Sequence, residues 1–129
     1  MSQENVKIAL RLLRLYNEGD LEALLEAFDP EAEIVTLVSG TYRGRSGVLR
    51  VAQENSEMMR GNRLEPVDVD SVRDHVIAEV EVRGEGRLSG IALVNERIAL
   101  VTTFRDGLVI RQETFRSRAE ALEAVGLPE

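Results

Sequence analysis

The sequence contains no cysteine, no tryptophan and only one histidine. Without cysteine there is no disulfide, no thiolate nucleophile and no thiolate ligand for a metal ion. A metal site would have to consist mainly of carboxylates, and no group of Asp and Glu residues has the spacing of such a site. We therefore expect neither a metal site nor a cofactor.

Long hydrophobic runs, a signal sequence and an excess of positive charge are also missing. No apolar stretch approaches the roughly 20 residues that span a bilayer, and the N-terminus lacks the basic and apolar regions of a signal peptide. The 23 acidic and 16 basic residues give a net charge of -7, which repels nucleic-acid phosphates, and aromatic residues make up only 4% of the chain. We expect a cytoplasmic protein that binds neither membranes nor nucleic acid.

The composition is that of a globular domain. Hydrophobic residues make up 43% of the chain and charged residues 30%. A chain of 129 residues is long enough to bury one ordinary core and too short for two. We predict a single domain over residues 1–129.

The first half of the chain has mainly helical periodicity. Residues 6–16 are apolar at helical spacing, and Asp20 is suited to cap a second, short helix that Pro30 ends. β-Branched residues over 33–40 predict a strand. The helical period returns over 44–61, which predicts a third helix.

The second half reads as a series of strands. They run from residue 61 to residue 115, with breaks at Asp74, over 83–90 and at the Asp106-Gly107 turn. The sequence Ser-Arg-Ala-Glu beginning at Ser117 is a capping box and predicts a terminal helix. Separate helices and an antiparallel series of strands indicate an α+β fold.

Five motifs in this order resemble the SnoaL-like branch of the nuclear transport factor 2-like superfamily: YNEGDLEALLEAFDPEAEI, YRGRSGV, GEGRLSGIAL, TFRDGLVIR and RAEALEAVGL. The resemblance covers almost the whole chain. It implies a curved antiparallel sheet wrapped around a conical pocket and covered by three helices, a cystatin-like α+β roll. Members include isomerases, cyclases, epoxide hydrolases, and binding or scaffold proteins, so the fold does not determine the function.

The catalytic positions of two such enzyme groups are occupied here by residues that do not exchange protons near neutral pH. Aligned with ketosteroid isomerases, the tyrosine and the two aspartates correspond to Leu12, Thr36 and Leu100. Aligned with limonene-epoxide hydrolases, the catalytic acid corresponds to Thr114. None of these side chains is an acid or base in this range.

Glu113 is the remaining acidic candidate, and its direction depends on the Asp106-Gly107 turn. A three-residue loop would place Leu108, Ile110, Gln112 and Thr114 on the inner face and Glu113 outside, whereas a two-residue loop would exchange the faces. The alignment and the mixed charges of neighbouring strands favour the outer face, where Glu113 would belong to a ladder of paired charges.

These considerations predict an apolar pocket with a few neutral polar groups, which is suited to a small hydrophobic molecule. Its predicted lining is Tyr16, Ile34, Thr36, Val38, Met59, Val80, Leu100, Thr102, Phe104, Gln112 and Thr114.

We predict a SnoaL-like protein that binds an apolar, polyketide-like or steroid-like molecule without the usual acid-base residues. One alternative is an isomerase, cyclase or epoxide-hydrolase-type enzyme that uses Glu113, with Tyr16 or His75 as its partner. Another is a non-catalytic dimeric scaffold. The resemblance also implies a homodimer formed through the outer sheet face.

Overall fold

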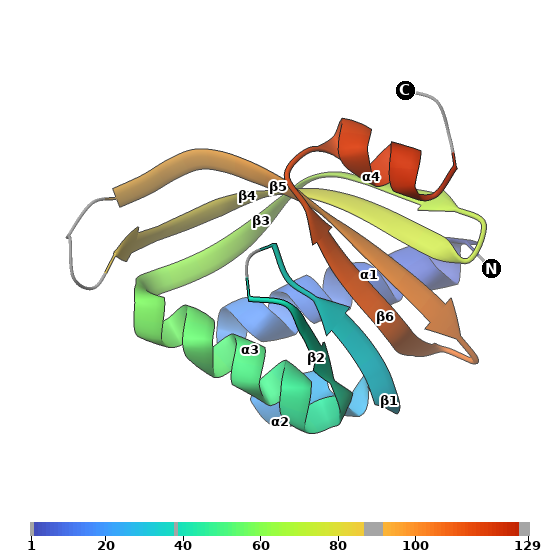
Figure 1. Cartoon of the computed structure of the whole chain (residues 1–129), viewed down its shortest axis with the longest axis horizontal. Helices are drawn as coiled ribbons and strands as arrows, with labels where there is room; N and C mark the ends of the chain where they lie inside the picture. Colours follow the sequence, from blue (N-terminus) through green and yellow to red (C-terminus); the bar gives the residue numbers. More distant parts are fainter. Residues whose placement is uncertain (1, 38, 87–91, 127–129) are drawn as a thin grey trace.

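A curved six-stranded sheet forms the centre of the molecule in the computed structural model, which describes residues 2–37, 39–86 and 92–126. Helices α1, α2 and α3 lie on one face, called the inner face, and α4 lies on the outer face (Figure 1). In chain order the elements are α1 (Ser2–Glu18), α2 (Leu21–Glu26), β1 (Phe28–Val35), β2 (Thr41–Arg43), α3 (Gly44–Met58), β3 (Met59–Val72), β4 (His75–Gly86), β5 (Ala92–Arg105), β6 (Leu108–Phe115) and α4 (Arg118–Ala124). The α+β prediction is confirmed. The short strand β2 was not predicted.

The strands lie in the order β2-β1-β6-β5-β4-β3. Strands β3 to β6 pair antiparallel with their neighbours in sequence, as predicted, whereas β1 pairs with β6 in parallel. Among the helices, none in the described part of the chain is long and apolar enough to cross a membrane. The parallel pair places Ile34 of β1 opposite Gln112 of β6, so two of the predicted pocket residues lie side by side.

Strand β1 begins and ends earlier than the predicted strand over 33–40. It runs from Phe28 to Val35 and therefore includes Pro30. The pairing of β1 with β6 shifts register between Phe28 and Glu33. A proline is tolerated in a strand at such an irregularity because no ladder hydrogen bond is required of its nitrogen.

The predicted helix caps are present. The Asp20 carboxylate accepts a hydrogen bond from the Ala23 amide at 3.3 Å, and the Ser117 hydroxyl accepts one from the Glu120 amide at 3.2 Å. Each such cap satisfies an amide that the helix leaves unpaired, and stabilises the helix by about 1 kcal/mol.

Apolar residues pack on both faces of the sheet. On the inner face, Leu12 and Leu15 of α1 pack in one cluster with Phe28 of β1 and Val109 of β6. On the outer face, α4 covers a smaller cluster through its fully buried Ala121. Burial of a large aliphatic side chain contributes about 1.5–3 kcal/mol, so the inner cluster is the main apolar support of the cavity described below.

The hairpin between β5 and β6 combines a two-residue turn with a bulge. Asp106 and Gly107 have φ values of 54° and 80°, as a tight primed turn requires. Phe104 is paired with Val109, but the next pair is Thr103 with Arg111, so Ile110 is an extra residue in β6. The bulge shifts the alternation of side chains by one residue.

Past the bulge, the side chains have the faces expected of a three-residue loop, although the loop has two residues. Beyond it, Gln112 is on the inner face opposite Thr102, and Glu113 is on the outer face opposite Val101. The prediction that Leu108 and Ile110 point inward is wrong, because Val109 is the residue buried in the inner cluster before the bulge.

Candidate functional site

A cavity of about 230 Å³ lies between the inner face of the sheet and helices α1, α2 and α3. Its wall is mostly aliphatic, with residues from α1, α3 and the inner faces of β1 and β3 to β6. Of the predicted pocket residues, the structure places on this wall Tyr16, Ile34, Thr36, Met59, Leu100, Thr102, Gln112 and Thr114.

The other predicted pocket residues lie elsewhere. Val80 is fully buried and packs against Leu13 and Leu100, because α1 covers this part of β4. Phe104 packs with Val109 in the inner core cluster and does not line the cavity. Val38 lies outside the described residues.

Three neutral polar side chains meet at one end of the cavity. The Tyr16 hydroxyl of α1 accepts a hydrogen bond from the Asn55 amide of α3 at 3.2 Å and another from the Asn62 amide of β3. Burial raises the pKa of the Tyr16 phenol, and the two asparagine hydrogen bonds act in the opposite direction. Tyr16 is thus held as a neutral phenol on the cavity wall.

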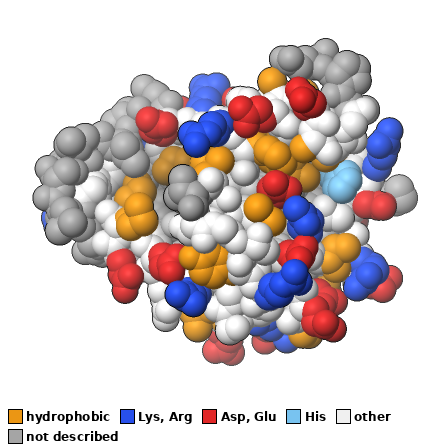
Figure 2. Space-filling model, viewed as in Figure 1, with side chains coloured by type: hydrophobic (Ala, Val, Ile, Leu, Met, Phe, Trp, Pro, Cys, Tyr) orange, Lys and Arg blue, Asp and Glu red, His pale blue; other side chains and the backbone are white. Residues whose placement is uncertain are grey.

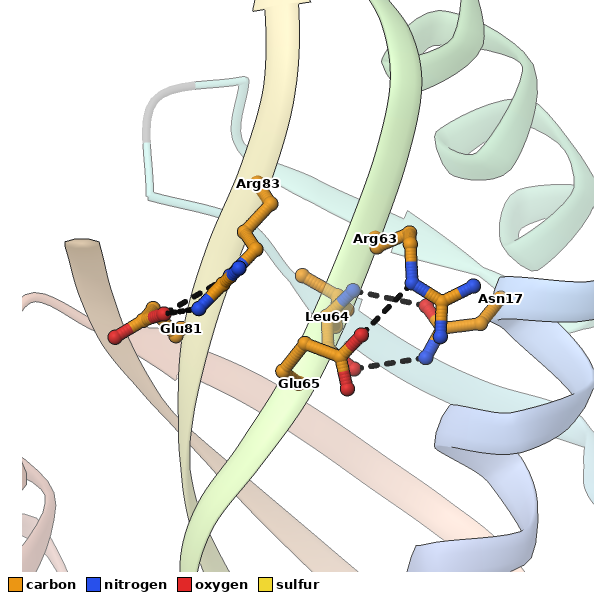
Figure 3. A network of polar contacts seen from close by, with 6 residues as sticks. All are labelled: Asn17, Arg63, Leu64, Glu65, Glu81 and Arg83. Carbon is orange, nitrogen blue, oxygen red and sulfur yellow. Dashed lines mark hydrogen bonds and ion pairs between the residues drawn. The ribbon is translucent and has the colours of Figure 1, made fainter. Parts of the chain in front are cut away.

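The neighbouring residue, Asn17, fixes the end of α1 to β3. Its side-chain oxygen accepts a hydrogen bond from the Leu64 amide, and its side-chain nitrogen donates to the Leu64 carbonyl, both at 2.8 Å (Figure 3). The Asn17 side chain therefore bonds to β3 as the backbone of a neighbouring strand would. This contact holds Tyr16 next to Asn62 on the same strand.

A second group of neutral polar residues lies where β5, β6 and β1 meet. The Gln112 amide donates to the Thr102 hydroxyl at 3.2 Å across the two strands. The Thr36 hydroxyl donates to the Gly40 carbonyl at 2.9 Å. Thr114 also lines the cavity from β6. Gln112, Thr102 and Thr114 can form hydrogen bonds without introducing charge, whereas the Thr36 hydroxyl is already used in the turn that follows β1.

The described residues of the cavity wall include no Asp, Glu, His, Lys or Arg. Among these described lining residues, only Tyr16 has an ionisable side chain, its phenol. The described part of the chain also contains no group of three or more His, Cys, Asp or Glu residues arranged to hold a metal ion. The cavity is therefore suited to binding and orienting an uncharged molecule.

Glu113 lies outside the cavity, in a ladder of ion pairs on the outer face. Its carboxylate is 3.1 Å from the Arg111 guanidinium, which is also 2.9 Å from Glu33, and Glu33 is 2.8 Å from Arg43. The ladder thus crosses β6, β1 and β2. Acidic and basic side chains are intermixed over the face seen in Figure 2.

His75 is also away from the cavity. Its Nδ1 atom is 2.9 Å from the Thr103 hydroxyl, the partner across β4 and β5. Its neighbour Val76 points into the inner core cluster, so alternation along the strand places His75 on the outer side. The structure therefore brings neither Glu113 nor His75 together with Tyr16.

The polar partners of Tyr16 were not predicted from the sequence. Asn55 is a polar residue on the apolar side of α3, in line with Val48 and Ala52. This position could have indicated that its side chain faces the cavity. Asn62 had no comparable signal, because it meets Tyr16 across 46 positions of the chain.

The sequence profile of the SnoaL-like domain family matches residues 9–112. None of the curated proteins matches the chain significantly in sequence. Several solved structures share its fold. A putative SnoaL-like polyketide cyclase from Jannaschia sp. CCS1 is 18% identical with a TM-score of 0.81, and the alignment covers 100% of this chain and 96% of that one.

Two further structures of similar fold contain small molecules. TerC co-crystallised with polyporic acid is 21% identical with a TM-score of 0.78, covering 93% of this chain and 96% of that one. A hypothetical protein of ketosteroid isomerase-like fold from Catenulispora acidiphila DSM 44928, in complex with trimethylamine, is 18% identical with a TM-score of 0.77, covering 94% and 93%. At these identities the similarity establishes the fold alone.

Proposed function

Because the chain belongs to the SnoaL-like domain family, we propose that it binds a small, uncharged and largely apolar molecule in its cavity. The observation that carries the proposal is the cavity wall, whose described residues are apolar or neutral. An apolar protein cavity of about 150 Å³ binds benzene. The cavity of about 230 Å³ is thus suited to a somewhat larger molecule, of one or two rings.

The polar groups of the wall would orient such a molecule. Tyr16 with its two asparagines lies at one end, and the Gln112 and Thr102 pair lies on the sheet. Few but well-placed polar groups in an apolar pocket are typical of small-molecule sites. Small molecules are present in two proteins of the same fold, which supports a small-molecule occupant here, and we propose an apolar or polyketide-like one.

In this proposal the protein binds its ligand without acid-base catalysis by Glu113 or His75. Both side chains lie on the outer side of the sheet, and Glu113 is paired with Arg111. A general base must come within hydrogen-bonding reach of the proton that it removes. The alternative of an enzyme that uses Glu113 therefore lacks an acid in the cavity.

The binding function is tested with indane, an uncharged two-ring hydrocarbon, titrated into the protein and followed by NMR chemical shifts. Ala52 is half-buried on the cavity wall, so Ala52→Phe should obstruct the cavity and weaken indane binding at least about 10-fold, equivalent to about 1.4 kcal/mol. The matched variant Ala124→Phe adds the same ring at an exposed position of α4 and should leave the affinity within about twofold.

Failure of the folded wild-type protein to bind indane at millimolar concentration would contradict the proposal. Equal binding to wild type and Ala52→Phe would place the bound molecule outside the cavity and would contradict it as well. Circular dichroism spectra of both variants establish that they are folded.

We also propose that the protein forms a homodimer through the outer sheet face. The support is the row of ion pairs on β6, β1 and β2, which presents both signs of charge in alternation. A two-fold dimer requires a self-complementary surface, and a face that carries both signs of charge is suited to this. The cytoplasmic location expected from the sequence stays a prediction.

A further inference from the structure

We infer that the Tyr16 hydroxyl donates a hydrogen bond to an oxygen of the bound molecule, so that the cavity selects apolar molecules with a neutral acceptor oxygen, such as a ketone, at one end. The inference rests on the proposed binding function and assigns the chemical class of the ligand.

The hydrogen bonds around Tyr16 leave its proton unused. A phenol oxygen has two acceptor sites and one proton to donate. The Asn55 and Asn62 amides both donate to this oxygen. In both bonds the Tyr16 oxygen is the acceptor, so neither of them uses the Tyr16 proton. The two asparagines therefore act as positioning residues, because they occupy the oxygen and leave the O–H group available to a ligand.

The place of Tyr16 indicates which end of the ligand would carry the oxygen. Tyr16, Ala52, Met59 and Asn62 line the cavity and also an adjoining, more open groove next to α1 and α3. These four residues thus form the boundary between the apolar interior and the surface. A ligand whose hydrocarbon part fills the cavity against the inner face of the sheet would place its oxygen at this boundary.

A neutral acceptor fits this end better than a charged group or a donor. A carboxylate would require a cation, and the described residues of the cavity wall provide none. A group that only donates could reach the carboxamide oxygens of the two asparagines, but it would leave the Tyr16 proton without an acceptor. Burial raises the pKa of Tyr16, so the phenol keeps its proton at neutral pH and remains a donor.

The test compares two probes that differ only in the oxygen, 1-indanone and indane. In Tyr16→Phe, 1-indanone should bind about 5- to 10-fold more weakly, which is the scale of one neutral hydrogen bond. Indane should bind to wild type and Tyr16→Phe within about twofold, since the phenylalanine ring preserves the apolar contacts.

Tyr42→Phe is the matched control. It removes the only other tyrosine hydroxyl of the chain, which donates to Glu54 at 2.6 Å and lies outside the cavity. Both probes should bind to this variant as they do to wild type, within about twofold. A loss of 1-indanone binding in Tyr42→Phe as large as in Tyr16→Phe would overturn the inference.

The infrared carbonyl band of bound, ¹³C-labelled 1-indanone reports the hydrogen bond directly. It should lie at lower frequency in the wild-type complex than in the Tyr16→Phe complex, because donation to a carbonyl weakens the C=O bond. If Tyr16→Phe does not fold, the wild-type band decides, and a band at the frequency found in an apolar solvent overturns the inference.

The outcomes separate this inference from the function on which it rests. If both probes bind and Tyr16→Phe changes their affinities equally, the ligand class is wrong and the binding function stands. If neither probe binds to folded wild type, the binding function and the inference are both overturned.

Discussion

At the scale of single residues, Glu113 is a carboxylate in a partly exposed ion pair with Arg111. Its side chain is 29% exposed and its partner Arg111 is 45% exposed. Ion pairs with this degree of exposure contribute little, because water screens them. We therefore expect Glu113→Gln to lower the free energy of unfolding by at most ~1 kcal/mol, and urea denaturation measures this.

The same variant tests the separation of Glu113 from the cavity. Binding of indane to Glu113→Gln should agree with wild type within about threefold, since no contact with the cavity is lost. A loss of about 100-fold in binding or in any turnover found later would contradict the placement of Glu113 on the outer face.

The Tyr16 phenol gives a prediction for alkaline pH. Burial raises its pKa in the folded state above the ordinary value of 10.0, despite the opposing hydrogen bonds from Asn55 and Asn62. The unfolded chain ionises first as pH rises, so the stabilisation is fully present below pH 10 and is lost as pH rises through the folded-state pKa.

The measurement uses Tyr42→Phe, in which Tyr16 is the only tyrosine, and the chain has no tryptophan to obscure phenolate absorbance. Titration of the folded variant should give an ionisation above pH 10, and titration in urea should give the ordinary value. Equal values in the two states would contradict the burial of this hydroxyl.

Residue patterns predicted the direction of Tyr16 toward the pocket but not its partners. An amphipathic helix shows which side of α1 faces the core. The contact with Asn62 depends on how α1 lies against β3, and Asn17 fixes this by bonding to Leu64 across 47 positions of the chain. Single-sequence periodicity contains no information on such a distant pair.

At the scale of elements, the turn of the β5–β6 hairpin was predicted correctly, but the bulge that follows it was not. The Asp106-Gly107 pair indicated a tight turn, which the structure contains. The bulge at Ile110 was not predicted because an extra residue in a strand leaves no reliable mark in the sequence. It changes the face of each later residue, so an error of one position determines whether Gln112 or Glu113 faces the cavity.

Deletion of Ile110 should be tolerated, because it removes the extra residue and leaves the register beyond it in place. Val109 stays opposite Phe104 and the next residue is Arg111, so Glu113 keeps its place on the outer face. Ile110 is only half-buried, so its loss removes less apolar burial than loss of a core residue. We expect the free energy of unfolding to fall by no more than about 1.5 kcal/mol in urea denaturation.

A second variant combines this deletion with insertion of one glycine after Gly107, which gives a three-residue loop without a bulge. It should be about as stable as the deletion alone, because Val109 is opposite Phe104 in both. A loss of about 3 kcal/mol or more in both variants would show that the hairpin needs Ile110 itself, and not only the register.

At the scale of the whole molecule, the local patterns predicted the helices, the antiparallel strands and the α+β class. They did not predict the parallel pairing of β1 with β6, because this contact joins strands separated by most of the chain. The short strand β2 was missed because three residues are too few for an alternating pattern. Most of the predicted pocket positions line the cavity, since strand alternation and helix amphipathicity fix which side chains face inward.

The proposed homodimer is tested by light scattering at micromolar concentration. We expect a mass of twice 14.4 kDa, and Arg43→Glu in the exposed row of ion pairs should shift the protein toward the monomer by placing like charges against a partner. The control Arg11→Glu reverses an exposed charge on α1, on the inner side of the sheet, and should keep the wild-type mass. A monomeric mass for wild type would contradict the proposal.

The bond between Asn17 and Leu64 has a consequence for what can attach to the sheet. Strand β3 is at one edge, and an edge strand presents free amides and carbonyls to which a strand of another chain can add. Asn17 occupies both outward groups of Leu64, and Pro66 two residues later has no N–H to offer. The other edge, β2, is only three residues long. The amide that anchors α1 thus also protects the molecule against aggregation by edge-to-edge strand addition.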